Sequence, residues 1–359
     1  MKIAFIIMKM GSGGAERSLS ALSSYMSKTE DVTVFVLDGT DSFYPFDDKV
    51  NVRYLSLDSI PSGKSIKRFF AVVKRAFTLR KAVKNEHPDV LIGMSHIMSA
   101  YAVFCTAFTK CRAVGTERSN PFKFNSGLLI TALRKITSLL CDGFVCQTKK
   151  AASFFPSSVQ KKCAVIPNAV FNPHVFETAV PSVREKNIAA LGRLEVYKGF
   201  DVLIKSFKSV SEKHPDHTLT IYGDGKEYDS LSALSRSLGI EDRVIFAGTD
   251  ENAIQKISQS SVFVLSSRFE GMPNALIEAM ASGVPCVSTD CDMGPSELIV
   301  NGENGLLVPV DDTEALTKAV DRILCDKTLS DKLSKNALSL RDSHNIASVC
   351  EKWLCYLKS

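Results

Sequence analysis

The sequence lacks the signatures of several protein classes. Its ten cysteines include no CxxC pair and form no metal-type group with histidine, so they indicate buried thiols in a reducing compartment. No apolar run reaches the ~20 residues that a membrane span needs. The apolar start of the chain, 3–7, is too short for a signal peptide. We therefore expect a cytoplasmic protein that contacts membranes only from outside.

Motifs for binding nucleic acid are also missing. The sequence has no zinc-finger spacing, no recognition-helix signature and no aromatic-and-basic RNA motif, so we expect no nucleic-acid partner. Residues 1–170 carry 24 Lys and Arg against 12 Asp and Glu, a net charge of +12, whereas the remainder carries 20 against 27, a net charge of −7. The first half is therefore expected to meet an anionic partner, either a membrane surface or a phosphate-bearing acceptor.

The length and the hydrophobic pattern predict an α/β chain of two domains. A chain of 359 residues is longer than one core usually serves. Short β-rich runs alternate with helical patterns, which predicts two Rossmann-like parallel sheets covered by helices. These runs lie at 3–7, 32–37, 52–55, 90–92, 113–115, 144–146, 188–191, 219–222, 244–246, 262–265, 286–288 and 305–308.

Three prolines interrupt this alternation, at Pro167, Pro173 and Pro181. Proline clusters without hydrophobic periodicity are typical of connections between domains. We therefore expect a first domain at 1–170, a linker at 171–185 and a second domain at 186–344. The end of the chain, about 345–359, is predicted to be helical.

A glycine-rich turn follows the first expected strand. It contains Gly13 and Gly14, and such a turn lets backbone amides approach a phosphate. The dinucleotide-binding fingerprint fails, however, because Glu16 stands where its third glycine should be. Asp38 lies roughly 20 residues further on, where the ribose-binding acid of that fingerprint would stand. Without the third glycine it is weak support for ribose binding. A simple tight turn and a loop that contacts a ligand remain equally good interpretations of this segment.

Two cations lie in one loop near the start of the second domain. Arg193 follows an expected strand, and Lys198 precedes the next expected helix. A guanidinium and an ammonium are suited to a diphosphate leaving group as its negative charge develops. The alternative is that both are ordinary solvated surface cations.

Two carboxylates flank an expected helix N-terminus further along the chain. The segment 267–280 places Glu270 on a loop and Glu278 about two turns into the helix that Pro273 begins. A helix N-terminus attracts phosphate, and carboxylates at its margins can accept hydrogen bonds from sugar and ribose hydroxyls. The alternative is that these acids serve only helix capping and solubility.

Taken together and in this order, these motifs resemble glycosyltransferase family 4, whose members are retaining enzymes of the GT-B fold that use nucleotide-sugar donors. The resemblance runs from the Gly13-Gly14 turn through Arg193, Lys198 and Glu270 to 305–308. It implies two Rossmann-like domains that face each other across a cleft. It also implies that the final helix crosses back to the first domain.

The resemblance also implies roles for individual residues. Arg193 and Lys198 would hold the diphosphate, Glu270 the hydroxyls of the donor sugar, and Glu278 those of the ribose. Gly14 would let the acceptor-side domain close onto the donor. The backbone of one segment would line the sugar and phosphate, and its residues are Gly271, Met272, Pro273, Asn274, Ala275 and Leu276.

Within the family, the start of the chain resembles enzymes that extend lipid-linked oligosaccharides, including bacterial α-1,4-N-acetylgalactosaminyltransferases. The implied function is transfer of a hexose or N-acetylhexosamine from a nucleotide-diphosphate sugar, with UDP favoured by analogy. The acceptor would be a polyprenyl-diphosphate-linked or similar surface glycan. A sugar-nucleotide epimerase of the same fold and a catalytically silent scaffold are the alternatives.

The sequence departs from the family at one position in the first domain. Many relatives have a histidine where this chain has Glu117 and Arg118. Arginine does not act as a general base, but Arg118 can hold an acceptor phosphate or the leaving diphosphate. His96 lies on the loop after another strand, where a packed histidine and a histidine lining the cleft are both reasonable interpretations.

We expect no metal cofactor. The only DxD-like sequence is Asp290-Cys291-Asp292, which fits a loop better than a strand end. Arg193 and Lys198 already supply the positive charge that a divalent cation would otherwise provide.

One strongly basic stretch, 64–84, combines apolar residues at near-helical spacing with Lys67, Arg68, Lys74 and Arg75. This pattern fits a helix on an anionic membrane, or a core helix with a solvated basic face. With the basic first half, it favours a peripheral position on the inner face of the cytoplasmic membrane.

Overall fold

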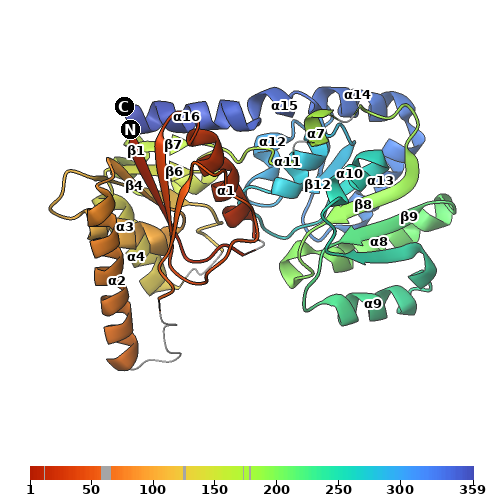
Figure 1. Cartoon of the computed structure of the whole chain (residues 1–359). Helices are drawn as coiled ribbons and strands as arrows, with labels where there is room; N and C mark the ends of the chain where they lie inside the picture. The colour runs from red at the N-terminus through yellow and green to blue at the C-terminus, as the bar shows by residue number, and fades with distance from the viewer. Residues whose placement is uncertain (12, 58–65, 124–126, 173, 178) are drawn as a thin grey trace. The chain divides into compact units, whose positions relative to one another are not determined.

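The computed structural model describes residues 1–11, 13–57, 66–123, 127–172, 174–177 and 179–359, with side chains at 66–69, 174 and 177 left out. The chain forms two compact units (Figure 1). The first is Met1–Asn168 together with Ile346–Ser359, and the second is Ala169–Asn345.

The first unit is a parallel sheet covered by helices. Its seven strands run in the order β3-β2-β1-β4-β5-β6-β7. The strands are β1 (Lys2–Ile7), β2 (Asp31–Val36), β3 (Asn51–Tyr54), β4 (Val90–Gly93), β5 (Arg112–Glu117), β6 (Gly143–Cys146) and β7 (Cys163–Val165). The helices are α1 (Gly14–Met26), α2 (Ile66–Glu86), α3 (His96–Thr106), α4 (Leu128–Leu140), α5 (Lys149–Ser153), α6 (Ser157–Lys161) and α16 (Ile346–Lys358).

The second unit repeats this plan with six parallel strands in the order β10-β9-β8-β11-β12-β13. The strands are β8 (Glu185–Leu191), β9 (Thr218–Tyr222), β10 (Val244–Gly248), β11 (Ser260–Leu265), β12 (Cys286–Thr289) and β13 (Leu306–Val308). The helices are α7 (His174–Glu177), α8 (Phe200–Lys213), α9 (Tyr228–Ser237), α10 (Ala253–Gln259), α11 (Asn274–Ala281), α12 (Pro295–Leu298), α13 (Thr313–Cys325), α14 (Lys327–Ala337) and α15 (Leu340–Ser343). Two short 3-10 helices are η1 (Val196–Lys198) and η2 (Glu241–Arg243).

The hydrophobic pattern explains this layering. Successive residues of β8, Ile188 and Ala189, point into the two different cores on opposite faces of the second sheet. Helix α8 buries Phe200, Leu203 and Phe207, which recur with the 3.6-residue period and so form one apolar face. The sequence-based prediction of two parallel α/β sheets is therefore confirmed.

The segment expected to be a linker, 171–185, belongs to the second unit. Val170 and Val175 are buried in the hydrophobic core of that unit, and β8 begins at Glu185. The broken periodicity of this segment reflects the short helix α7 and irregular backbone packed on that core.

The C-terminal helix α16 lies against α1 in the first unit (Figure 1). Its Tyr356 hydroxyl donates to the Lys162 carbonyl at 2.6 Å and accepts from the Phe144 amide at 2.7 Å. The Lys358 ammonium donates to the Glu30 carboxylate at 2.6 Å. These bonds attach the last helix to strands and helices of the N-terminal half.

Among the described residues, the structure contains no helix that combines the length and the hydrophobicity needed to span a bilayer.

Candidate active site

The topology of the second sheet determines where a ligand can bind. Strand order reverses between β8 and β11, so the connections after these neighbouring strands diverge toward opposite faces of the sheet. In open parallel sheets, ligands bind in the crevice beyond the carboxyl ends of the strands at such a reversal. The loops in question are 192–199 and 266–273, and they carry Arg193, Lys198 and Glu270.

Gly199 allows these two loops to approach each other closely. Its φ is +65°, and a Cβ at this position would lie 2.1 Å from the Ser266 carbonyl oxygen. The Ser266 hydroxyl in turn donates to the Lys198 carbonyl at 2.9 Å. Only glycine tolerates both the left-handed backbone and the close contact. The position of Lys198 is therefore fixed relative to the loop after β11.

Lys198 and Glu270 form an ion pair at this point of contact. The Lys198 ammonium donates to Glu270 Oε1 at 2.6 Å, and the two side chains are only 15% and 10% exposed. The Ser267 hydroxyl donates to the same oxygen at 2.6 Å. Burial lowers the pKa of Lys198, but attraction and hydrogen bonding to Glu270 outweigh that effect and raise the pKa above its usual value. The ammonium is therefore charged at neutral pH.

Aromatic stacking connects the same two loops. The rings of Tyr197 and Phe269 stack with centroids 4.9 Å apart, and the Arg268 amide donates to the Tyr197 carbonyl at 2.7 Å. Arg193 is exposed, and its guanidinium donates to the Tyr197 hydroxyl at 3.1 Å. The structure thus brings Arg193, Lys198 and Glu270 together around one pair of loops.

Arg268, although close in sequence to Glu270, is committed to a different interaction. Its guanidinium makes two 2.9 Å hydrogen bonds to the Asp201 carboxylate and a 2.8 Å ion pair with Asp311. Burial raises the pKa of Asp201, but the hydrogen bonds and charge of Arg268 outweigh it and hold that pKa below its usual value. Two carboxylates neutralise Arg268, so this cation is not available to a phosphate.

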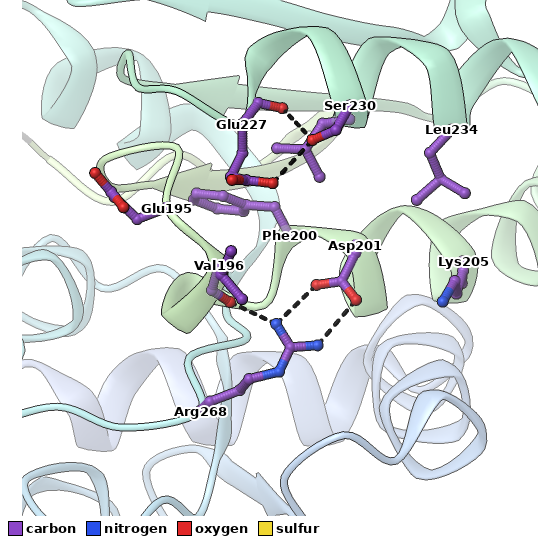
Figure 2. Close-up of a pocket in the computed structure, with 10 residues that line it drawn as sticks. Glu195, Val196, Phe200, Asp201, Lys205, Glu227, Ser230, Leu234 and Arg268 are labelled. Atoms are coloured by element: carbon purple, nitrogen blue, oxygen red, sulfur yellow. Dashed lines mark hydrogen bonds and ion pairs between the residues drawn. The ribbon is translucent and has the colours of Figure 1, made fainter. Parts of the chain in front are cut away.

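A pocket of about 370 Å³ lies beside this network. Figure 2 shows Arg268 directed at Asp201, with Glu227 and Ser230 on the opposite wall. None of Arg193, Lys198, Glu270 and Glu278 is among the residues that line it, which are Glu195, Val196, Phe200, Asp201, Lys205, Glu227, Ser230, Leu231, Leu234 and Arg268. The pocket is therefore not the site that those residues form.

Helix α11 presents its N-terminus next to Glu270. Pro273 occupies its N-cap position. Gly294 packs against this turn, because a Cβ there would lie 2.5 Å from the Gly271 carbonyl oxygen. Met272 and Leu276 are buried in the hydrophobic core, so only the backbone of these two residues can face a ligand.

Glu278 lies further along the same helix and is 1% exposed. The remaining predicted residues of the segment, Asn274 and Ala275, are half-buried in the first turn. A carboxylate as buried as that of Glu278 needs hydrogen-bond partners to remain ionised. The burial of Glu278 argues against a role in helix capping or solubility, because either role requires a solvated acid.

The glycine turn of the first unit begins a helix. Gly13 is the N-cap of α1 and Gly14 its first residue. A Cβ at Gly13 would lie 2.4 Å from a carboxylate oxygen of Glu16. The Glu16 side chain thus folds back over the turn. Glu16 is the residue that replaces the third glycine of the dinucleotide fingerprint. Asp38 forms an ion pair with Arg75 and is not part of this turn.

Arg118 follows β5 in the same unit. Its Nη2 donates to the Ser18 hydroxyl of α1 at 2.6 Å and to the Asn168 side-chain oxygen at 2.8 Å. Burial lowers the pKa of Arg118 to about 10, with the charge of Glu16 opposing this effect. The guanidinium is therefore charged at neutral pH and sits beside the helix that the glycine turn begins.

Buried Glu117 and half-buried His96 both contact Arg134 of α4. Arg134 Nε lies 3.2 Å from the Glu117 carboxylate, and Ser119 donates to that carboxylate at 2.6 Å. Arg134 Nη2 lies 3.4 Å from His96 Nδ1. Burial, reinforced by Arg134, lowers the pKa of His96 to about 4, so its ring is neutral at pH 7. Burial also raises the pKa of Glu117, with Arg134 opposing that shift.

Comparison with known proteins agrees with this geometry. Residues 12–171 match the family model described as Glycosyltransferase Family 4, and residues 176–339 match the model described as Glycosyl transferases group 1. The two matches cover nearly all of both units.

The chain is a glycosyltransferase.

Known relatives extend over the whole glycosyltransferase chain. One is the Campylobacter jejuni GalNAc-α-(1→4)-GalNAc-α-(1→3)-diNAcBac-PP-undecaprenol α-1,4-N-acetyl-D-galactosaminyltransferase, 27% identical over 99% of this chain and 97% of the relative. A second, from the same organism, is the N-acetylgalactosamine-N,N′-diacetylbacillosaminyl-diphospho-undecaprenol 4-α-N-acetylgalactosaminyltransferase, 27% identical over 99% of each chain. Both act on undecaprenol-linked acceptors, as their names state.

Solved structures identify the fold of the glycosyltransferase as GT-B. The complex of Anabaena HepE with UDP and glucose superimposes with a TM-score of 0.78 at 18% identity and covers all of both chains. The expected fold class is thereby confirmed. The expected glycosyltransferase activity is confirmed by the two family models and the named relatives.

Sequence reasoning missed several residues that contact or adjoin the predicted site residues of either unit. Arg134 lies mid-helix in an apolar stretch, and nothing in its spacing links it to Glu117. Tyr197 and Phe269 each precede a predicted site residue in the sequence. Their position next to Lys198 and Glu270 was a signal from which they could have been found. Asp201 lies in the first turn of α8, where an acidic residue is also explained by the helix dipole.

The described part of the glycosyltransferase contains one group of possible metal ligands: His214, Asp321 and Cys325. This group lies where α8 ends, whereas Lys198 precedes the start of α8. A helix of 14 residues is about 21 Å long. The group is therefore not placed to act on the ion pair of Lys198 and Glu270.

Proposed function

We propose that this glycosyltransferase moves a hexose or N-acetylhexosamine from a UDP-sugar onto a polyprenyl-diphosphate-linked oligosaccharide, with retention of the anomeric configuration. The observation that supports it most is the buried ion pair of Lys198 and Glu270 at the point where the strand order reverses. The undecaprenol-linked acceptors in the names of two relatives support the acceptor class. UDP in the complex of a similar fold supports the donor base.

In this proposal, Lys198 and Arg193 stabilise the departing diphosphate. Lys198 precedes helix α8, and the amide groups at a helix N-terminus carry partial positive charge. A charged ammonium in a site shielded from water stabilises developing negative charge far more than it would in bulk water. Arg193 adds a planar guanidinium that can bind two phosphate oxygens.

Glu270 and Glu278 are proposed to bind the rest of the donor. Glu270 is held by Lys198 and Ser267 through the same oxygen, Oε1. Its other oxygen is thereby oriented to accept from a donor-sugar hydroxyl. Glu278 would accept from the ribose hydroxyls, and the backbone from Gly271 to Leu276 would line the sugar and phosphate.

Arg118 is proposed to bind phosphate on the acceptor side. Its guanidinium is charged and is oriented by Ser18 and Asn168 through a single nitrogen, Nη2. Its Nε has no hydrogen-bond partner among the described residues. A guanidinium cannot serve as a general base at neutral pH. We therefore assign removal of the acceptor proton to the leaving diphosphate itself, while Gly13 and Gly14 would allow the first unit to approach the donor.

Glu117 and His96 contribute to this proposal only indirectly. Both side chains contact Arg134 inside the first unit. They would orient the end of β5, from which Arg118 projects. His96 is therefore proposed to be a packed histidine that does not contact substrate.

Catalysis is expected to be independent of a divalent metal. EDTA should leave turnover essentially unchanged, because Lys198 and Arg193 supply the charge that neutralises the diphosphate. The check is the initial rate with and without EDTA, with a known metal-dependent transferase as a control for chelation. Complete loss of activity that Mg²⁺ or Mn²⁺ restores would show that the diphosphate is neutralised in another way.

We also propose that the protein is peripheral on the inner face of the cytoplasmic membrane. Helix α2 exposes Phe70 and Phe77 together with Lys74, which suits an anionic lipid surface. One sequence-based expectation about this helix is wrong, because Arg75 is buried and paired with Asp38. The side chains of Lys67 and Arg68 lie outside the described residues.

The proposed function is tested by comparing donor alone with donor plus a lipid-diphosphate oligosaccharide. We expect the acceptor to gain one sugar and UDP to be released in equal amount, with no change in donor alone. Conversion of donor to its epimer without an acceptor would instead establish an epimerase. Absence of any turnover with every nucleotide sugar would favour a scaffold.

A further inference from the structure

Helix α4 of the first unit is amphipathic in the opposite sense to an ordinary surface helix. The side chains that it buries are polar: Arg134, Thr137 and Ser138. All of its large apolar side chains except that of Ile130 are exposed. A helix in contact with water on its outer face normally shows the reverse arrangement.

The exposed apolar side chains of α4 form one stripe. They are 44% to 92% exposed, and the residues are Leu128, Leu129, Leu133, Ile136, Leu139 and Leu140. At 3.6 residues per turn, these six positions fall within about 140° of the helix circumference. The buried polar residues lie on the opposite side. Scattered apolar residues on a surface need no explanation, but a contiguous stripe marks an interaction site.

The stretch of chain that contains this stripe is strongly basic. The segment 118–162 carries eight Lys and Arg and one acid, Asp142, for a net charge of +7. The Asp142 carboxylate accepts from the Ala113 amide at 2.7 Å. The exposed lysines of the segment are Lys123, Lys135, Lys149, Lys150 and Lys161. An anionic partner therefore complements the surroundings of the stripe.

Aromatic contacts join the edge of α4 to its neighbours. The Lys135 ammonium lies 5.3 Å from the centroid of the Phe154 ring. Phe122, which is exposed, meets that ring edge to face at 5.1 Å. Lys162 donates to the Leu139 carbonyl at 3.0 Å, near the end of the helix. The stripe and its flanking cations are thus parts of one surface.

We propose that the α4 stripe inserts into the headgroup region of an anionic membrane. Amphipathic helices with apolar and basic residues bind in this way, through buried apolar area and attraction to acidic lipids. A second copy of the chain fits less well, because a two-fold contact along the stripe would bring the same lysines face to face. This inference rests on the proposed function, because the proposed lipid-linked acceptor lies in the membrane.

The buried face of α4 connects this surface to the acceptor-side residues. Arg134 reaches from α4 to Glu117 and His96. Arg118 follows Glu117 directly. Insertion of the stripe would therefore hold the end of β5 at a fixed orientation to the lipid surface, where a lipid-diphosphate acceptor is bound.

The first test is co-sedimentation with vesicles of phosphatidylglycerol and phosphatidylethanolamine. The variant Leu129→Ser/Leu133→Ser/Leu140→Ser should lower partition into these vesicles by roughly 100-fold, because three leucines no longer leave water on binding. A matched control, Val183→Ser/Ile245→Ser/Val300→Ser, removes equally exposed apolar side chains from the second unit. The control should bind like wild type.

The second test locates the inserted helix. Ile136→Trp should be quenched by brominated lipids, whereas native Trp353 is buried and should not be. Phe70→Trp on α2 should be quenched less. If Phe70→Trp is quenched strongly and Ile136→Trp is not, α2 is the inserting helix and the proposal is wrong.

Two further outcomes would overturn the proposal. Vesicle binding that survives the triple α4 substitution would exclude the stripe, and so would a wild-type dimer that the same substitution dissociates in sedimentation equilibrium. Activity on a short-chain, water-soluble acceptor separates this inference from the proposed function. It should persist in the α4 variant, whereas an inactive wild type would refute the proposed transfer itself.

Discussion

Replacing either Lys198 or Glu270 by alanine is expected to lower turnover by ~100-fold or more, because a charged contact that stabilises the transition state is lost. The two side chains form a shielded ion pair at 2.6 Å, so each variant also leaves its partner misplaced. We therefore expect the double variant to lose little more than either single variant. Initial rates at saturating donor and acceptor measure these effects.

A matched control for these variants is available in the same unit. Lys256 and Asp250 form an ion pair with the same 2.6 Å separation, in which Lys256 is largely exposed. Lys256→Ala should retain near-normal turnover, since an exposed pair contributes little. Near-normal rates in folded Lys198→Ala and Glu270→Ala would overturn the assignment of the site.

Glu117→Gln is expected to lower the free energy of unfolding by about 3 kcal/mol, because the buried charge of Arg134 would lose the opposite charge of Glu117. Arg134 is fully buried and Glu117 nearly so. Burial already raises the pKa of Glu117 against the attraction of Arg134. Burying the ion pair of Glu117 and Arg134 therefore costs desolvation energy. Replacing both residues together by apolar ones should lower stability little. Urea unfolding followed by circular dichroism measures the difference.

Two variants make the Glu117 prediction specific. Glu86→Gln breaks the exposed pair of Glu86 with Arg53 and should change stability by less than about 1 kcal/mol. Glu117→Leu/Arg134→Met should recover most of the stability that Glu117→Gln loses. A Glu117→Gln protein as stable as wild type would mean that the pair does not hold α4 against β5.

The sequence was sufficient to predict the fold because the strands follow a simple pattern. Buried parallel strands are short continuous apolar runs, and these alternate with helices through both halves of the chain. The resemblance to the family placed both Lys198 and Glu270 at the donor, but the reversal of strand order beside them is known only from the structure. Their 2.6 Å contact was not predictable, because it depends on Gly199 fitting against Ser266.

Other features depend on packing that no local pattern records. The basic stretch 64–84 gave no sign that Arg75 faces inward to Asp38. Glu117 was a reasonable substrate contact from its place after a strand, yet its carboxylate meets Arg134 from α4. Only the structure shows that most of the apolar residues of α4 face outward.

The most direct test of the account is the anomeric configuration of the sugar transferred from an α-linked UDP-sugar to a polyprenyl-diphosphate oligosaccharide. Proton NMR of the released glycan reports this configuration, and mass spectrometry reports the number of sugars added. We predict the addition of a single α-linked sugar together with an equal amount of UDP. A β-linked product would contradict the retaining mechanism, and an epimerised donor with an unchanged acceptor would contradict glycosyl transfer itself.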